Sequence, residues 1–260
     1  MAVTSIYIVG PSSSGKSTLC GALFKHFTAE PQPRPLRSEG RSVVPYTISE
    51  VARKVMRERQ FTRDDVGTLE MQQAILEAQV KAERDALAFL ASFDPPRERV
   101  LLSDCCTIDA LVYTRKFVSE DAYKTLCKTL EFQEALRRYR GKRAKGNDGA
   151  HVLFILTLGV AEWLIDDGIR NMDKPEAVLE EFRFVLNELE IPFVKLGSEI
   201  MELGRRVEWV VSKARLDVSG IEVPWVSHSS PMPTMSRLPS TPNPDPIDRR
   251  RGDITSAYYT

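Results

Sequence analysis

The chain has 260 residues, of which 42% are hydrophobic and 28% charged, and its 36 basic side chains match its 36 acidic ones in number. This composition is typical of globular proteins and argues against a nucleic-acid partner, which would require an excess of basic residues. No apolar run approaches the roughly 18 residues of a membrane span, and the first residues predict a strand rather than a signal peptide because no basic region precedes them. The four cysteines form no CxxC pair, which predicts no zinc site and a reducing compartment, cytoplasmic or nuclear.

Strand and helix patterns alternate along most of the chain. A β-branched apolar run at 5–9 ends at a glycine and predicts a buried strand, and leucines at helical spacing predict a helix over 16–29. Prolines make 31–42 a loop. Further strands are predicted at 43–49, 100–103, 151–158 and 192–196, and helices from residue 50, at 66–93 with Gly67 as a site of interruption, and at 107–118, 119–138, 173–190 and 198–215.

The turn between the first strand and the first helix carries the most specific motif. It matches G-x-x-x-x-G-K-[ST] and consists of Gly10, Pro11, Ser12, Ser13, Ser14, Gly15, Lys16, Ser17 and Thr18. Glycines permit the backbone torsions that turn N–H groups towards phosphate oxygens, and the following helix adds its N-terminus. We expect Lys16 to contact the β- and γ-phosphates of ATP and the Ser17 hydroxyl to be a ligand of Mg²⁺.

These patterns together predict an α/β fold. We expect a P-loop NTPase of the nucleoside- or nucleotide-kinase type, with three α/β/α layers and a mostly parallel five-stranded sheet over residues 1–217. Phosphates would then bind at the carboxyl ends of the strands. Residues 218–260 are rich in proline and serine and show no apolar periodicity, which predicts a disordered tail.

Three acidic residues are candidates for the remaining chemistry. Asp104 ends the strand VLLSD and is predicted to bind Mg²⁺, to cap the helix that begins near Cys106, or to do both. Glu50 follows the second strand and is either the general base for a substrate hydroxyl or a residue of a first helical turn. Asp109 is a candidate substrate contact, with a plain surface acid as the alternative.

The segment EWLIDDGIR, residues 162–170, has the composition of a lid. Trp163 could stack on a flat ring and Arg170 could stabilise charge on the transferred phosphoryl group. The alternative is an exposed helix with one buried tryptophan.

Six motifs in order resemble the NadR-type P-loop domain family over about residues 3–215. They are GPSSSGKST, ISEVAR (48–53), VGTLEMQ (66–72), LLSD with TIDALVY (101–113), EWLIDDGIR and IPFVKLG (191–197). The resemblance implies a ribosylnicotinamide kinase-like activity, in which the γ-phosphate of ATP passes to the 5′-hydroxyl of a nucleoside. It also implies site residues: Lys16 and Ser17 for ATP and magnesium; Glu50, Arg53 and Asp104 on the acceptor and metal side; Gln72 or Gln73 near the acceptor base; and Trp163, Asp166, Asp167 and Arg170 in the lid.

The chain also departs from that family. Cys105 stands where many members have an arginine directly after the strand-terminal acid, and the 31–42 loop and the tail lie outside the family core. A small-molecule kinase that uses ATP and Mg²⁺ is therefore the leading prediction, and a nucleotide-dependent regulatory or interaction protein is the alternative. A mechanical AAA-type ATPase is disfavoured, because the sequence shows no second-region arginine finger or C-terminal helical bundle.

Overall fold

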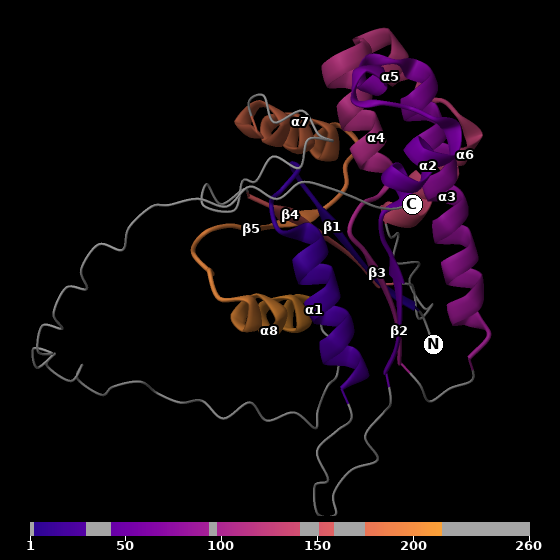
Figure 1. Cartoon of the computed structure of the whole chain (residues 1–260). Helices are drawn as coiled ribbons and strands as arrows, with labels where there is room; N and C mark the ends of the chain where they lie inside the picture. The colour runs from indigo at the N-terminus through magenta and orange to yellow at the C-terminus, as the bar shows by residue number, and fades with distance from the viewer. Residues whose placement is uncertain (1–2, 30–42, 94–97, 141–150, 159–174, 215–260) are drawn as a thin grey trace, which may run out of the picture. The chain divides into compact units, whose positions relative to one another are not determined.

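Five strands form one parallel sheet in a computed structural model that describes residues 3–29, 43–93, 98–140, 151–158 and 175–214 (Figure 1). The strands are β1 (Val3–Val9), β2 (Val43–Ile48), β3 (Glu98–Ser103), β4 (His151–Thr157) and β5 (Phe193–Leu196), and their order in the sheet is β2-β3-β1-β4-β5. The central strand β1 places Tyr7 opposite Ser103 of β3 and opposite Phe154 of β4. The carboxyl ends of β1, β3 and β4 are therefore neighbours.

Helices cover both faces of this sheet, as Figure 1 shows. On one face Leu19 and Leu23 of α1 (Lys16–Thr28) and Val210 of α8 (Leu203–Ala214) pack against Ile6 and Ile8. The other face, with Tyr7 and Val9, belongs to a core that also contains buried side chains of α2 (Val51–Arg59), α3 (Leu69–Ala91), α4 (Thr107–Tyr113), α5 (Glu120–Cys127), α6 (Leu130–Tyr139) and α7 (Pro175–Glu188). Alternate residues of β1 thus enter two separate cores, because side chains alternate between the faces of a strand. The predicted three-layer α/β/α fold is confirmed.

Helix boundaries differ from the predicted ones where short polar side chains cap new turns. The predicted interruption near Gly67 is present: a 3₁₀ helix, η1 (Arg63–Gly67), precedes α3, and Thr68 caps α3 by accepting from the Met71 amide. The single helix predicted over 119–138 is wrong, because Thr129 accepts from the Phe132 amide and starts α6 separately from α5. The helix predicted over 107–118 ends as a π-helical turn, η2 (Thr114–Val118).

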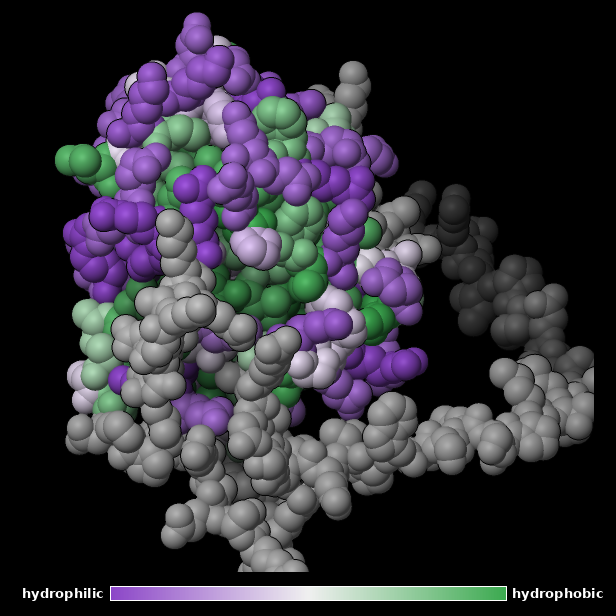
Figure 2. All heavy atoms as spheres, turned by 180° about the vertical axis from the view of Figure 1, so that it is seen from behind, coloured by the Kyte–Doolittle hydropathy of each residue, from purple (hydrophilic) through white to green (hydrophobic). Residues whose placement is uncertain are grey.

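Figure 2 shows, on the face opposite to the view of Figure 1, an apolar area surrounded by hydrophilic side chains. Across the residues that the structure describes, no helix has both the length and the apolar composition needed to cross a bilayer. The predicted loop at 31–42, the lid segment 162–170 and the tail 218–260 lie outside the described residues, and the domain boundary at 217 remains a prediction.

Candidate active site

The loop between β1 and α1 is a tight turn that two glycines make possible. Gly10 has a φ of 141°, and a Cβ atom there would lie 2.6 Å from the backbone oxygen of Thr157 in β4. Gly15 has a φ of 82° at the N-cap of α1. Any larger residue at Gly10 would both strain the backbone and displace β4, so this position requires glycine.

A buried hydroxyl pair fastens the same loop to β4. Ser14 is fully buried, and its Oγ lies 2.7 Å from Thr157 Oγ1, which in turn donates to the backbone oxygen of Val9 at 3.1 Å. A threonine hydroxyl has one hydrogen, so Ser14 must be the donor to Thr157. Sequence reasoning missed Thr157, although a polar residue ending the apolar strand VLFILT was a usable signal.

Lys16, the first residue of α1, folds its side chain back over the loop. Its ammonium group donates to the backbone oxygens of Gly10, at 2.7 Å, and Pro11, at 2.5 Å, and the residue is only 8% exposed. The helix N-terminus adds partial positive charge at the same place. The loop therefore concentrates positive charge and backbone donors in the arrangement that binds phosphate.

Asp104 follows β3 and meets the second residue of α1. Its Oδ2 accepts a 2.8 Å hydrogen bond from the Ser17 hydroxyl, the residue is 4% exposed, and its backbone amide donates to the backbone oxygen of Ile48 at 3.3 Å. A hydroxyl oxygen beside a carboxylate oxygen is the donor set that Mg²⁺ prefers, with water and phosphate completing its shell. These residues fit the predicted metal. The prediction of Asp104 as a helix cap is wrong, because Cys106 holds the N-cap position of α4.

Asp109 lies near Lys16 and Asp104 and caps α4 from its third position. Its Oδ2 accepts from the Cys106 amide at 2.8 Å. Burial raises the pKa of the Asp109 carboxyl to about 6; Asp104 pushes it in the same direction, while Lys16 and the Cys106 amide oppose the shift. The residue is half-buried and belongs to the same charged cluster as the phosphate loop.

Glu50 and Arg53 form a second, exposed charged pair beyond the carboxyl end of β2. Glu50 occupies the N-cap of α2 with a left-handed φ of 59°, and its carboxylate lies 3.1 Å from the Arg53 guanidinium. Their side chains are 45% and 35% exposed. Glu50 therefore lies at the start of a helix, and its carboxylate is also exposed, as a general base for a substrate hydroxyl would have to be.

Of the remaining predicted residues, Gln72 belongs to the described part of the chain, and those of the lid segment do not. Gln72 is 2% exposed and donates to the backbone oxygen of Val66 at 2.8 Å, so it ties η1 to α3. The Tyr113 hydroxyl, which was given no role from the sequence, lies 3.1 Å from Ser12 Oγ and links α4 to the phosphate loop. Trp163, Asp166, Asp167 and Arg170 lie outside the described residues.

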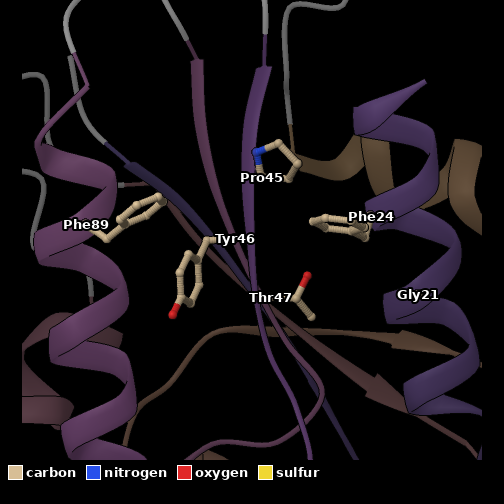
Figure 3. Close-up of a pocket in the computed structure, with 6 residues that line it drawn as sticks. All are labelled: Gly21, Phe24, Pro45, Tyr46, Thr47 and Phe89. Atoms are coloured by element: carbon tan, nitrogen blue, oxygen red, sulfur yellow. The ribbon is translucent and has the colours of Figure 1, made fainter. Parts of the chain in front are cut away.

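An apolar cavity of about 540 Å³ lies apart from this cluster, around the edge strand β2. Figure 3 shows Phe24 of α1 on one side of the strand and Tyr46 with Phe89 of α3 on the other. None of residues 10–18 lines the cavity, and Pro45 in its wall lacks the N–H that an added strand would need. The polar and charged groups described above lie in the loop of residues 10–18 and not in this cavity.

Comparison with known proteins identifies the family. A family model described as an AAA domain matches residues 5–202. The chain belongs to this AAA domain family. No curated protein matches the chain.

Solved structures show that this AAA domain has the NadR fold that the motifs predicted. NadR in complex with NAD and AMP-PNP is 16% identical over 82% of this chain and 50% of that one, with a TM-score of 0.56. NadR in complex with NR is 18% identical over 82% and 52%, with a TM-score of 0.57. The chain thus spans about half the length of NadR. Deoxyadenosine kinase from M. mycoides with bound dATP is 13% identical over 82% of this chain and all of that one, with a TM-score of 0.43.

Proposed function

We propose that this protein binds ATP with Mg²⁺ at residues 10–18 and transfers the γ-phosphate to a hydroxyl of a nucleoside-like molecule. The hydrogen bond between Ser17 and Asp104 carries the proposal, because it joins the phosphate loop to a buried acid from the neighbouring strand. Together with the folded-back Lys16, it places one cationic and one metal-binding group at the end of the same helix. A simple structural turn needs neither group.

Each residue of the loop has a separate part in this chemistry. The chemistry that a bound Mg²⁺ would supply is positive charge against the phosphate groups. Ser17 and Asp104 would hold the ion. Lys16 would exchange at least one of its two carbonyl acceptors for a phosphate oxygen, since both acceptors belong to the loop that receives the nucleotide. Phosphoryl transfer needs mainly such positioning and charge stabilisation from the protein.

The acceptor is assigned to the side of the site that Glu50, Arg53 and Asp109 border. Glu50 would accept the proton of the attacking hydroxyl, because its carboxylate is exposed beyond the carboxyl end of a strand. Gln72 would act indirectly, through the position of η1, rather than by touching the acceptor base. The relatives in complex with NAD, AMP-PNP and NR favour a nucleoside as the chemical class of the acceptor.

Lys16→Ala tests the nucleotide site. The variant should lose ATP binding in isothermal titration calorimetry, because it removes the charge that is folded over the loop. Lys25→Ala is the matched control: Lys25 lies in the last turn of the same helix and is exposed, so ATP binding should stay unchanged. Equal ATP affinity in Lys16→Ala and wild type would overturn the proposed phosphate site.

A second function, nucleotide-dependent regulation without a kinase activity, is favoured by Cys105. This thiol follows Asp104 at the position where the resembling family often carries an arginine, so the site has one cation fewer for an acceptor. A panel of nucleosides with γ-labelled ATP separates the two functions. Label on one nucleoside supports the kinase, and ATP hydrolysis that no nucleoside alters supports the regulatory protein.

A further inference from the structure

A fully buried glutamate in α3 lies at the centre of a polar network that the proposed reaction does not use. Glu83 is 0% exposed. Its Oε1 accepts from the Tyr139 hydroxyl at 2.7 Å and from Gln79 Nε2 at 3.1 Å, and its Oε2 accepts from the Tyr7 hydroxyl at 3.3 Å and the Arg138 guanidinium at 3.4 Å. A buried carboxylate is costly unless it is paired, and here donors from β1, α3 and α6 surround it.

Two of these donors continue to residues 103–107, the segment that carries Asp104. Gln79 Nε2 also lies 3.2 Å from the backbone oxygen of Cys105 and 3.4 Å from Ser103 Oγ. The Tyr139 oxygen accepts from the amide of Thr107 at 3.3 Å and from its hydroxyl at 3.0 Å. Gln79 therefore links Ser103 and Cys105 to Glu83, and Tyr139 links Thr107 to Glu83.

The direction of these hydrogen bonds depends on the carboxylate. Burial raises the pKa of both phenols, Tyr7 and Tyr139, so each keeps its proton. Tyr139 has one hydrogen and gives it to Glu83, which leaves its oxygen lone pairs to accept from Thr107. An amide in place of the Glu83 carboxylate would turn a donor towards one of its present donors and disturb this order.

We infer that Glu83 is a positioning residue that fixes the Ser103–Thr107 segment, and with it the Asp104 carboxylate, against Ser17. The inference rests on the proposed function, in which Asp104 binds Mg²⁺. Rigid support behind a metal-binding carboxylate keeps the ligand in place before the metal arrives, and loss of such support lowers metal affinity. Asp104 approaches Ser17 at 2.8 Å, and its own amide donates to the backbone oxygen of Ile48 at the end of the neighbouring strand.

Three variants separate positioning from plain stability. Glu83→Gln keeps the shape and changes the order of donors, and Tyr139→Phe removes the hydroxyl that leads to Thr107. Tyr7→Phe is the matched control. The Tyr7 hydroxyl also donates to Glu83, but none of the hydrogen bonds given above connects it to residues 103–107. Two quantities are measured for each protein: hydrogen exchange of a peptide covering 103–109, and ATP affinity with and without Mg²⁺.

In Glu83→Gln and Tyr139→Phe we expect faster hydrogen exchange of the 103–109 peptide than in wild type. The gain in ATP affinity that Mg²⁺ produces should be about three- to tenfold smaller in these two variants, which corresponds to one lost hydrogen bond. Metal-free ATP affinity should not change, and Tyr7→Phe should resemble wild type in both measurements. Unchanged Mg²⁺ dependence in Tyr139→Phe, or an equal loss in Tyr7→Phe, would overturn the positioning role while leaving the proposed function intact. A wild-type protein that does not bind ATP would instead remove the proposed function and this inference together.

Discussion

The carboxyl ends of two neighbouring strands, β2 and β3, both carry acids, yet the two ends are built differently. At β3, Asp104 is 4% exposed and bonded to Ser17, and a buried network fastens the residues around it. At β2, Glu50 and Arg53 form an ion pair with side chains 45% and 35% exposed. A fixed acid suits a ligand of defined geometry such as a metal ion, whereas an exposed pair can rearrange around a variable molecule. The contrast supports the separate assignment of metal and acceptor roles to the two ends.

We call the end of β3, with Asp104, the rigid end, and the end of β2, with Glu50 and Arg53, the exposed end. The largest effect is expected from Asp104→Asn at the rigid end. The amide keeps the shape and removes the negative charge, so Mg²⁺-dependent turnover should fall on the order of 1,000-fold, which corresponds to about 4 kcal/mol in the barrier. Phosphoryl transfer at saturating ATP, measured against Mg²⁺ concentration, checks this. Turnover close to wild type with an unchanged Mg²⁺ requirement would remove Asp104 from the metal site.

Glu50→Gln at the exposed end should give the next largest effect. Loss of a general base lowers the rate of transfer by roughly 100-fold, while ATP affinity stays the same because Glu50 does not touch the phosphate loop in the contacts described. Single-turnover kinetics with labelled ATP and an identified acceptor separate the two quantities. If transfer proceeds at the wild-type rate, Glu50 is only the start of α2.

The sequence predicts the rigid end better than the exposed one, for a physical reason. The phosphate loop follows from local rules, since Gly10 and Gly15 have the left-handed torsions that the motif requires. Asp104 follows from its place after a strand. The partners Thr157, Tyr139 and Glu83 are distant in sequence, and no periodicity connects them, because pairing of buried polar groups depends on tertiary packing.

The helix ends show the same limit. Thr129 interrupts a segment whose apolar spacing predicts a continuous helix, since a local hydroxyl-to-amide bond outweighs the helical pattern there. Gln72 was predicted to face a substrate from a motif alone. Its burial and its bond to Val66 became visible only once η1 and α3 were in place.

Acid stability should report Asp109, whose carboxyl lies near Lys16 and Asp104. Its folded pKa of about 6 lies above the ordinary value, so the folded state binds the proton more tightly, and the free energy of unfolding decreases as pH rises from about 4 to about 6. The full shift corresponds to about 3 kcal/mol, and we expect on the order of 2 kcal/mol because the carboxyl keeps some contact with solvent. Urea unfolding between pH 4 and 7, without nucleotide or metal, measures this.

Asp109→Asn serves as the comparison for that profile. The amide oxygen can still accept from the Cys106 amide, so the helix cap is retained while the titrating group is removed. The variant should lose this part of the pH dependence. An unchanged slope between pH 4 and 6 would show that another group, such as the buried Glu83, is responsible.

The smallest effect is expected from Arg53→Gln. Exposed ion pairs contribute about 0–1 kcal/mol, because solvent screens them and both long side chains lose freedom. The free energy of unfolding should therefore change by less than about 1 kcal/mol. Arg138→Gln is the matched variant in the network behind the rigid end. Its partner Glu83 is fully buried but keeps the donors Tyr139 and Gln79, so the loss of this hydrogen-bonded ion pair should cost about 2 kcal/mol. Parallel urea melts of the two variants measure both effects. Equal destabilisation would mean that the two strand ends do not differ in rigidity. The separate roles assigned to the two ends would then lose their structural basis.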